Sequence, residues 1–325
     1  MNNEFTIVLP DSCVIAQICG TNDSNIKLIE NHLGLSVFTK GNELSIDTDD
    51  ASKKQQFKFI IDRILDELSE SPSDTANPSD LISSILNNGF VRDEIDTNFS
   101  AGDFAISIPG STRKVYPKTK NQCALVNAFR KSDLVFAVGP AGSGKTFLAI
   151  AEALRLVLSK KINSLILTRP VVEAGESLGF LPGSLEEKIN PYLRPLYDSM
   201  NSCVSHETVH KLTENGIIEI APLAYMRGRT LNNAAVILDE AQNTTTEQMK
   251  MFLTRMGENS KVFITGDITQ IDLPKRYNSG LVHALKILRG IPEISIVELD
   301  GSDVVRSSLV KKIVQAYENE QKSEQ

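Results

Sequence analysis

The sequence has 325 residues, which exceeds one average domain and favours two domains or one large domain with an attachment. Its 34 Lys and Arg against 41 Asp and Glu give a net charge of −7. This balance argues against a protein coated with basic residues for nucleic acid, although it leaves room for a local basic groove.

The N-terminus lacks the basic and apolar segments of a secretion signal. The longest apolar runs have the length of a strand and are too short to cross a bilayer. Four scattered cysteines form neither a C-x-x-C pair nor a disulfide scaffold. These features predict a cytoplasmic protein without a membrane segment.

Residues 1–69 are predicted to form a small α+β domain with the order strand, helix, strand, strand, helix. The first strand is expected at residues 14–18. Asp23 and Gly34 then bound a helix whose apolar side chains recur at helical spacing. A hairpin at residues 35–46 and a second amphipathic helix follow.

Residues 70–104 are predicted to form a linker with a short helix at residues 81–86. The stretch that begins it is rich in Ser, Asp and Pro, which is typical of a connecting segment.

Residues 105–320 are predicted to form an α/β domain. Apolar, β-rich runs alternate there with helical stretches, and the runs are residues 134–138, 165–168, 217–220, 235–238, 262–265 and 294–299. Near-continuous apolar strands between helices indicate a mainly parallel sheet that is covered on both faces.

One loop in this domain matches the phosphate-binding pattern G-x-x-x-x-G-K-[ST] in full. Its residues are Gly139, Pro140, Ala141, Gly142, Ser143, Gly144, Lys145 and Thr146. The glycines let the backbone wrap a phosphate, and the helix that follows offers unpaired N–H groups. Lys145 is expected to reach the β- and γ-phosphates of ATP, and the Thr146 hydroxyl to bind Mg²⁺.

Two acids end the apolar run at residues 235–238. Asp239 fits a carboxylate on the Mg²⁺ side, and Glu240 fits a general base that deprotonates the attacking water. Gln270 follows the next strand and is expected to sense the γ-phosphate or position water. The alternatives are a solvated Asp-Glu pair at a strand end and a capped turn at Gln270.

Two further sequence patterns are interpreted as structural and not as functional sites. Thr244 and Glu247 are expected to form a capping box, and the Met-rich face of the helix that follows is expected to lie in the core. His206 and His210 lie in an H-E-x-x-H pattern, but no further ligand pattern follows, so a zinc protease is rejected.

The residues resemble the PhoH family over residues 105–320. The strongest stretches are residues 139–146, 168–183, 191–198, 221–231, 237–245 and 265–270. The N-terminal attachment is similar to that of the PhoL/YbeZ-like branch. This resemblance implies a P-loop core similar to that of superfamily 1 helicases, with ATP hydrolysis tied to RNA in rRNA processing. It also implies a homo-oligomeric ring, a hexamer, and a YbeY-type endoribonuclease as partner.

The likeness to helicases suggests roles for four more residues. Gln122 lies upstream of the phosphate loop, where it would pair with adenine; the alternative is a surface Gln at a helix start. Arg227 and Arg229 are candidates for an RNA contact or for reaching a neighbour's nucleotide. Arg306 is another candidate for an arginine finger, and a structural salt bridge is the alternative for each of the three. The family commonly has His after Arg306, where this chain has Ser307.

The order expected for the N-terminal domain resembles a KH-like module, which clamps nucleic-acid backbone with a Gly-x-x-Gly loop. The corresponding stretch, residues 20–23, has Gly20 but lacks the second Gly, and Asp23 in its place would repel phosphate. RNA binding and protein docking both remain open for this domain.

The sequence therefore predicts an RNA-linked ATPase. The alternative is a nucleotide-gated scaffold that delivers a nuclease to RNA with little turnover of its own. Glu240 distinguishes the two, because a pure switch does not need a general base.

Overall fold

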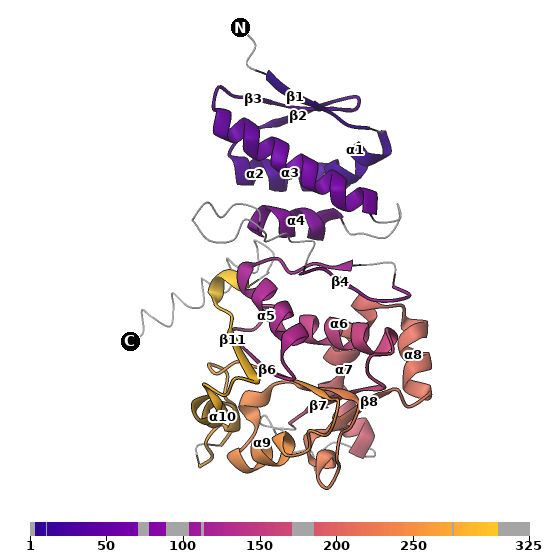
Figure 1. The fold of residues 1–325 in the computed structure, drawn as a ribbon, viewed down its shortest axis with the longest axis vertical. Coiled ribbons are helices and arrows are strands. Elements are labelled where there is room, and N and C mark those ends of the chain that lie inside the picture. Colours follow the sequence, from indigo (N-terminus) through magenta and orange to yellow (C-terminus); the bar gives the residue numbers. More distant parts are fainter. Residues whose placement is uncertain are drawn as a thin grey trace.

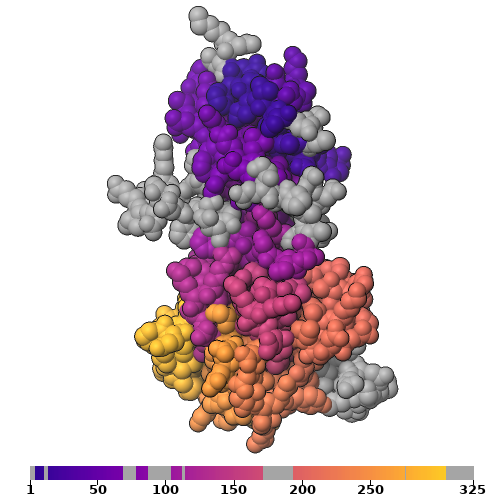
Figure 2. Space-filling model, turned by 45° about the vertical axis from the view of Figure 1, so that its right-hand side comes forward, coloured from indigo at the N-terminus to yellow at the C-terminus, as the bar shows by residue number. Residues whose placement is uncertain are grey.

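The computed structural model describes residues 4–10, 12–70, 78–88, 104–111, 114–170, 185–274 and 276–304. Within these ranges a small α+β unit precedes a larger α/β core, and the two are stacked end to end (Figures 1 and 2). Among the described helices, none combines the length and the apolar composition that crossing a membrane requires.

The N-terminal unit has the order strand, helix, helix, strand, strand, helix. Its elements are β1 (Glu4–Val8), α1 (Ser12–Cys19), α2 (Ser24–Leu33), β2 (Val37–Lys40), β3 (Glu43–Asp47) and α3 (Ala51–Glu70). The strands pair antiparallel in the order β1-β3-β2, and the helices cover one face of this sheet (Figure 1). The predicted hairpin and the predicted last helix are confirmed.

The strand predicted at residues 14–18 is wrong, because these residues lie within α1. A short apolar run fits a strand and a buried helical segment equally well. In α1, Val14 and Ile18 lie one turn apart and contact the same hydrophobic core. Asp23 does precede α2, but its backbone is left-handed and its side chain makes no capping hydrogen bond.

α4 (Pro78–Asn88) belongs to the hydrophobic core of the N-terminal unit. It packs against α2 and α3, and its apolar side chains join theirs in one buried cluster. The helix predicted at residues 81–86 is confirmed and extends further at both ends.

The segment around β5 (Lys114–Val115) joins the two units. β5 pairs with β4 (Ile106–Ser107), and Lys114 Nζ lies 3.8 Å from Glu67 Oε2 of α3. Lys118 Nζ donates to Asp80 Oδ1 of α4 at 2.6 Å. Lys114 and Lys118 therefore each form an ion pair with the N-terminal unit.

Six strands form the sheet of the core in the order β11-β6-β10-β9-β7-β8, and each of these pairings is parallel. The strands are β6 (Leu134–Val138), β7 (Ser164–Arg169), β8 (Ile218–Pro222), β9 (Ala234–Leu238), β10 (Lys261–Gly266) and β11 (Ile294–Glu298). The predicted α/β class with a parallel sheet is confirmed.

Successive residues of the central strands enter different cores, because side chains alternate across a sheet. Ala235 and Ile237 of β9 pack with α5 (Lys120–Lys131), α6 (Lys145–Leu158), α7 (Leu185–Cys203) and α8 (His206–Glu214). Val236 and Leu238 pack on the other face with α9 (Thr246–Leu253) and α10 (Gly280–Leu288). Burial on both faces explains why these strands read as continuous apolar runs.

The capping box of α9 lies one residue later than predicted. Thr245 and Gln248 form it, instead of Thr244 and Glu247. The stretch Thr-Thr-Thr-Glu-Gln contains two overlapping patterns, and the hydroxyl of Thr244 is already used by the carbonyl of Ala241. The Met-rich face of α9 lies in the core, as predicted.

Ser84→Ala should destabilise the junction between the two units. The Ser84 hydroxyl is buried and donates to the Pro117 carbonyl at 2.5 Å, so the substitution removes a buried hydrogen bond between α4 and the segment before α5. We expect the free energy of unfolding to fall by about 1–3 kcal/mol in urea denaturation. Ser83→Ala is the control, because the Ser83 hydroxyl bonds within α4 to Ser79. Equal losses in both variants would contradict the assignment.

Candidate functional site

The phosphate loop connects β6 to α6 and needs glycine at two positions. A Cβ on Gly139 would lie 2.5 Å from the carbonyl oxygen of Leu299. Gly144 caps α6 with a φ of 83°, a conformation that other residues rarely adopt. Because α6 begins at Lys145, its first N–H groups have no helical partner and lie at the loop, where an anion can accept them.

Lys145 lies over the loop. Its Nζ donates to the carbonyl oxygens of Gly139 at 2.7 Å and Pro140 at 2.8 Å. Burial lowers the pKa of Lys145, and the charges of Asp267, Glu240 and Asp239 partly oppose this shift. The ammonium group is thus held among polar oxygens that phosphate oxygens can replace.

Asp239 directly follows β9 and connects the loop to β9 and β10. Its Oδ1 accepts hydrogen bonds from the Thr146 hydroxyl and from the Thr265 hydroxyl, each at 2.7 Å. Thr146 lies in the first turn of α6 and Thr265 lies near the end of β10. β10 lies between β6 and β9, so these three residues meet at one edge of the sheet.

The Thr146–Asp239 pair fits Mg²⁺ by the chemistry of its donors. Mg²⁺ prefers oxygen ligands, and in phosphate-transfer sites it takes one or two from the protein and the rest from phosphates and water. A threonine hydroxyl and a buried carboxylate that already lie 2.7 Å apart supply such a pair.

Glu240 is held by two neighbours that the sequence analysis missed. Its Oε1 lies 3.0 Å from Arg169 Nη2, and its Oε2 accepts from Gln242 Nε2 at 2.6 Å. The backbone of Glu240 is left-handed, with a φ of 53°. Arg169 is the last residue of β7, the strand beside β9, so the rule that polar strand ends line a site could have found it.

Asp267 fastens β10 to the phosphate loop. Its Oδ2 accepts from the backbone N–H of Ala141 at 3.0 Å, and its own N–H donates to Gln242 Oε1 at 3.0 Å. Gln242 therefore contacts both Glu240 and β10. Gln270, predicted to sense phosphate or water, is exposed and lines the same cavity.

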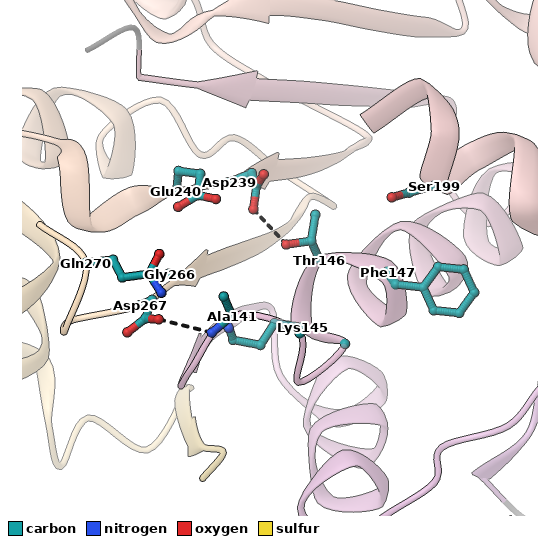
Figure 3. Close-up of a pocket in the computed structure, with 12 residues that line it drawn as sticks. Ala141, Lys145, Thr146, Phe147, Ser199, Asp239, Glu240, Gly266, Asp267 and Gln270 are labelled. Atoms are coloured by element: carbon teal, nitrogen blue, oxygen red, sulfur yellow. Dashed lines mark hydrogen bonds between the residues drawn. The ribbon is translucent and has the colours of Figure 1, made fainter. Parts of the chain in front are cut away.

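These residues surround a cavity of ≈ 270 Å³ over the phosphate loop (Figure 3). Of the predicted site residues, it is lined by Ala141, Gly142, Gly144, Lys145, Thr146, Asp239, Glu240 and Gln270. Gly266, Asp267, Phe147 and Ser199 complete the lining. The structure thus brings together residues that are far apart in the sequence.

Gln122 lies beside the phosphate loop but contacts protein groups. It is buried, its Nε2 donates to the Ser143 carbonyl at 3.0 Å, and its Oε1 accepts from the Lys118 N–H at 2.6 Å. In this arrangement Gln122 supports the loop. Pairing with adenine stays a prediction.

The three candidate arginines lie in different settings. Arg229 forms two hydrogen bonds with Glu219, at 2.5 and 2.7 Å, which is the structural alternative stated above. Arg227 is exposed, and Arg306 lies outside the described residues. Neither Arg227 nor Arg229 lines the cavity over the phosphate loop.

Comparisons with known proteins agree on one family. The profile of the family described as PhoH-like protein matches residues 114–318. The PhoH-like protein of Bacillus subtilis (strain 168) is 47% identical over 313 residues, which cover 96% of this chain and 95% of that protein. The chain belongs to the PhoH-like protein family.

Other members of the family match different shares of this chain. The PhoH-like protein of Synechocystis sp. (strain ATCC 27184 / PCC 6803 / Kazusa) is 41% identical and covers 96% of this chain and 94% of its own. Protein PhoH of Escherichia coli (strain K12) is 45% identical over 208 residues, only 63% of this chain and 59% of its own. The core is thus that of a PhoH-like P-loop NTPase, and the family profile begins at β5, after the N-terminal unit.

Solved structures give weaker likenesses. The large terminase from a thermophilic bacteriophage is 12% identical, covers 60% of this chain and 49% of its own, and has a TM-score of 0.37. The Pif1 helicase from Candida albicans is 16% identical, covers 55% and 39%, and has a TM-score of 0.28. Scores this low support no argument about this chain.

Nucleotide affinity should fall at alkaline pH as Lys145 loses its proton. Burial sets the pKa of Lys145 below 10.5 in the free chain, and bound phosphates favour its protonated form. Affinity is therefore constant below that pKa and declines as the pH rises through it. Calorimetry with a non-hydrolysable ATP analogue measures this. Lys145→Arg stays protonated, so any binding it retains should not show the decline; an identical decline there would contradict the assignment.

Proposed function

We propose that this chain binds Mg-ATP on the phosphate loop and hydrolyses its γ-phosphate. The observation that carries the proposal is the position of Asp239, which meets the hydroxyl of Thr146 while the next residue, Glu240, lines the same cavity. A metal-binding pair and a carboxylate base thus lie on one side of a phosphate-binding loop, which is the arrangement that phosphoryl transfer to water requires.

Each residue has a role that its contacts support. Lys145 would move from the loop carbonyls to the β- and γ-phosphate oxygens. Thr146 and Asp239 would hold Mg²⁺, which supplies charge neutralisation on the phosphates. Glu240 would accept the proton of the attacking water, because a carboxylate has about four lone-pair positions and its two protein partners leave room for another donor. Gln270, on the same cavity, would help to position that water.

We also propose that ATP hydrolysis is coupled to the binding or remodelling of RNA. Support comes from the resemblance to the PhoH family and from the loop at residues 20–23, which lies between α1 and α2 where KH-like modules carry their backbone clamp. A homo-oligomeric ring, with a neighbour's arginine at the γ-phosphate, is part of the same proposal.

One observation favours the second candidate, a nucleotide-gated scaffold. Asp23 lies in the loop that would clamp RNA, and its carboxylate would oppose phosphate. A protein partner, such as a YbeY-type endoribonuclease, would tolerate that charge at the N-terminal unit.

Glu240→Gln decides between the two functions. The amide keeps the size of the side chain and cannot take a proton, so we expect ATP turnover with RNA to fall by about 10²–10⁴-fold while ATP binding remains. A steady-state phosphate-release assay and a nucleotide-binding titration measure the two quantities. Unchanged turnover would refute the catalytic role of Glu240 and favour the scaffold.

Arg169→Gln should lower kcat with little change in KM. The charged hydrogen bond from Arg169 orients the Glu240 carboxylate, and its loss should reduce turnover by about tenfold or more. Arg289→Gln is the control, because it breaks an exposed ion pair with Glu298 and leaves the site intact. If both variants turn over ATP at the wild-type rate, Arg169 has no positioning role.

A further inference from the structure

A second cavity, of ≈ 390 Å³, adjoins the one over the phosphate loop. The two cavities share Gly142, Gly144 and Phe147. The second cavity is also lined by Asp80 of α4 and by Lys118, so both units of the chain contribute to its wall.

Phe147 lies where the two cavities meet. It follows Thr146 in the first turn of α6, and its ring is partly exposed. Figure 3 shows this ring on the opposite side of the loop from Asp267 and Gln270. A nucleotide whose γ-phosphate faces Asp239 and Glu240 would therefore extend its base past Phe147 and into the second cavity.

The ring of Phe147 offers a flat apolar surface at this point. Nucleic-acid bases stack on aromatic side chains because every base has a π-face, and such stacking contributes about 1–3 kcal/mol per base. The rest of the wall combines apolar side chains, among them Val115 and Leu148, with the polar side chains of Asp80 and Lys118 at the junction of the two units. The cavity therefore presents a mainly apolar surface for stacking and a local hydrogen-bonding group.

The polar wall is connected to the phosphate loop by a chain of hydrogen bonds. Asp80 Oδ1 accepts from Lys118 Nζ at 2.6 Å, and the Lys118 backbone N–H donates to Gln122 Oε1 at 2.6 Å. Gln122 Nε2 then donates to the Ser143 carbonyl at 3.0 Å. The position of α4 is thereby linked to that of the loop.

We propose that the second cavity binds the base and ribose of the nucleotide, with the base stacked on Phe147 and facing the Asp80–Lys118 ion pair. The proposal rests on the proposed ATP site. The Asp80 carboxylate can accept from an exocyclic amino group while bonded to Lys118, which suits an amino-purine base. The N-terminal unit thus takes part directly in nucleotide binding.

Two ligands separate the base subsite from the phosphate subsite. ATP would fill both cavities, whereas inorganic tripolyphosphate would reach only the phosphate loop. In Phe147→Leu, which keeps an apolar side chain and loses the ring, we expect ATP affinity to fall by about 5- to 150-fold. We expect Asp80→Asn to lower the ATP affinity as well. The affinity for tripolyphosphate should fall clearly less than the affinity for ATP in both variants, measured by calorimetry.

Glu67→Gln is the matched control for the junction. Glu67 pairs with Lys114 across the same two units and does not itself line the cavity, although Lys114 does, so the variant changes the charge of the junction without removing a group proposed to contact the base. This variant should bind both ligands as the wild type does. A loss of ATP affinity in Glu67→Gln equal to that in Asp80→Asn would overturn the role of Asp80 in the base subsite.

The outcomes distinguish this inference from the proposed function. Wild-type protein that binds neither ATP nor tripolyphosphate would refute the ATP site itself. If the wild type binds both ligands, two results for Phe147→Leu would overturn only the base subsite. One is an unchanged affinity for both ligands, and the other is an equal loss of affinity for both. Hydrogen exchange gives a second readout: ATP should slow exchange in α4 (Pro78–Asn88) more than tripolyphosphate does. Equal effects of the two ligands would overturn the contribution of the N-terminal unit.

Discussion

The site depends on one buried carboxylate that two hydroxyl groups share. Asp239 is only 6% exposed, and a carboxylate removed from water is costly unless hydrogen bonds compensate it. Thr146 and Thr265 both donate to its Oδ1, and bonds to a charged acceptor are short and strong. Thr146 lies in the first turn of the helix after the phosphate loop, and Thr265 belongs to β10, which lies between β6 and β9. This single oxygen therefore fixes the spacing of the loop, β9 and β10.

Glu240, unlike Asp239, has a strained backbone conformation, and neighbouring side chains hold its carboxylate in place. A left-handed backbone at a residue other than glycine costs on the order of 1–3 kcal/mol, so the surrounding structure must maintain it. Gln242 and Arg169 hold the two carboxylate oxygens, and Gln242 also bonds to the backbone of Asp267. Strain of this kind is common where a side chain must point into a site, and here it directs Glu240 to the cavity over the loop.

The N-terminal unit is coupled to the site through packing and charge at the same place. α4 shares the hydrophobic core of that unit, while its Asp80 bonds to Lys118 in the wall of the second cavity, beside the phosphate loop. Lys118 and Gln122 then connect this junction to the phosphate loop. Any event at the nucleotide that moves Gln122 would therefore also act on α4, which gives a physical route between the two units.

The sequence by itself determined what depends on local order. The phosphate loop, the Asp239–Glu240 pair at a strand end and the parallel α/β class follow from spacing along the chain. The strand predicted at residues 14–18 was wrong, because a short apolar run fits both a strand and a buried helix. Only the tertiary structure decided that Arg169 pairs with Glu240, that Thr265 bonds to Asp239 and that Asp80 lines a cavity beside the phosphate loop. Those contacts follow from strand order and domain packing, which local sequence does not specify.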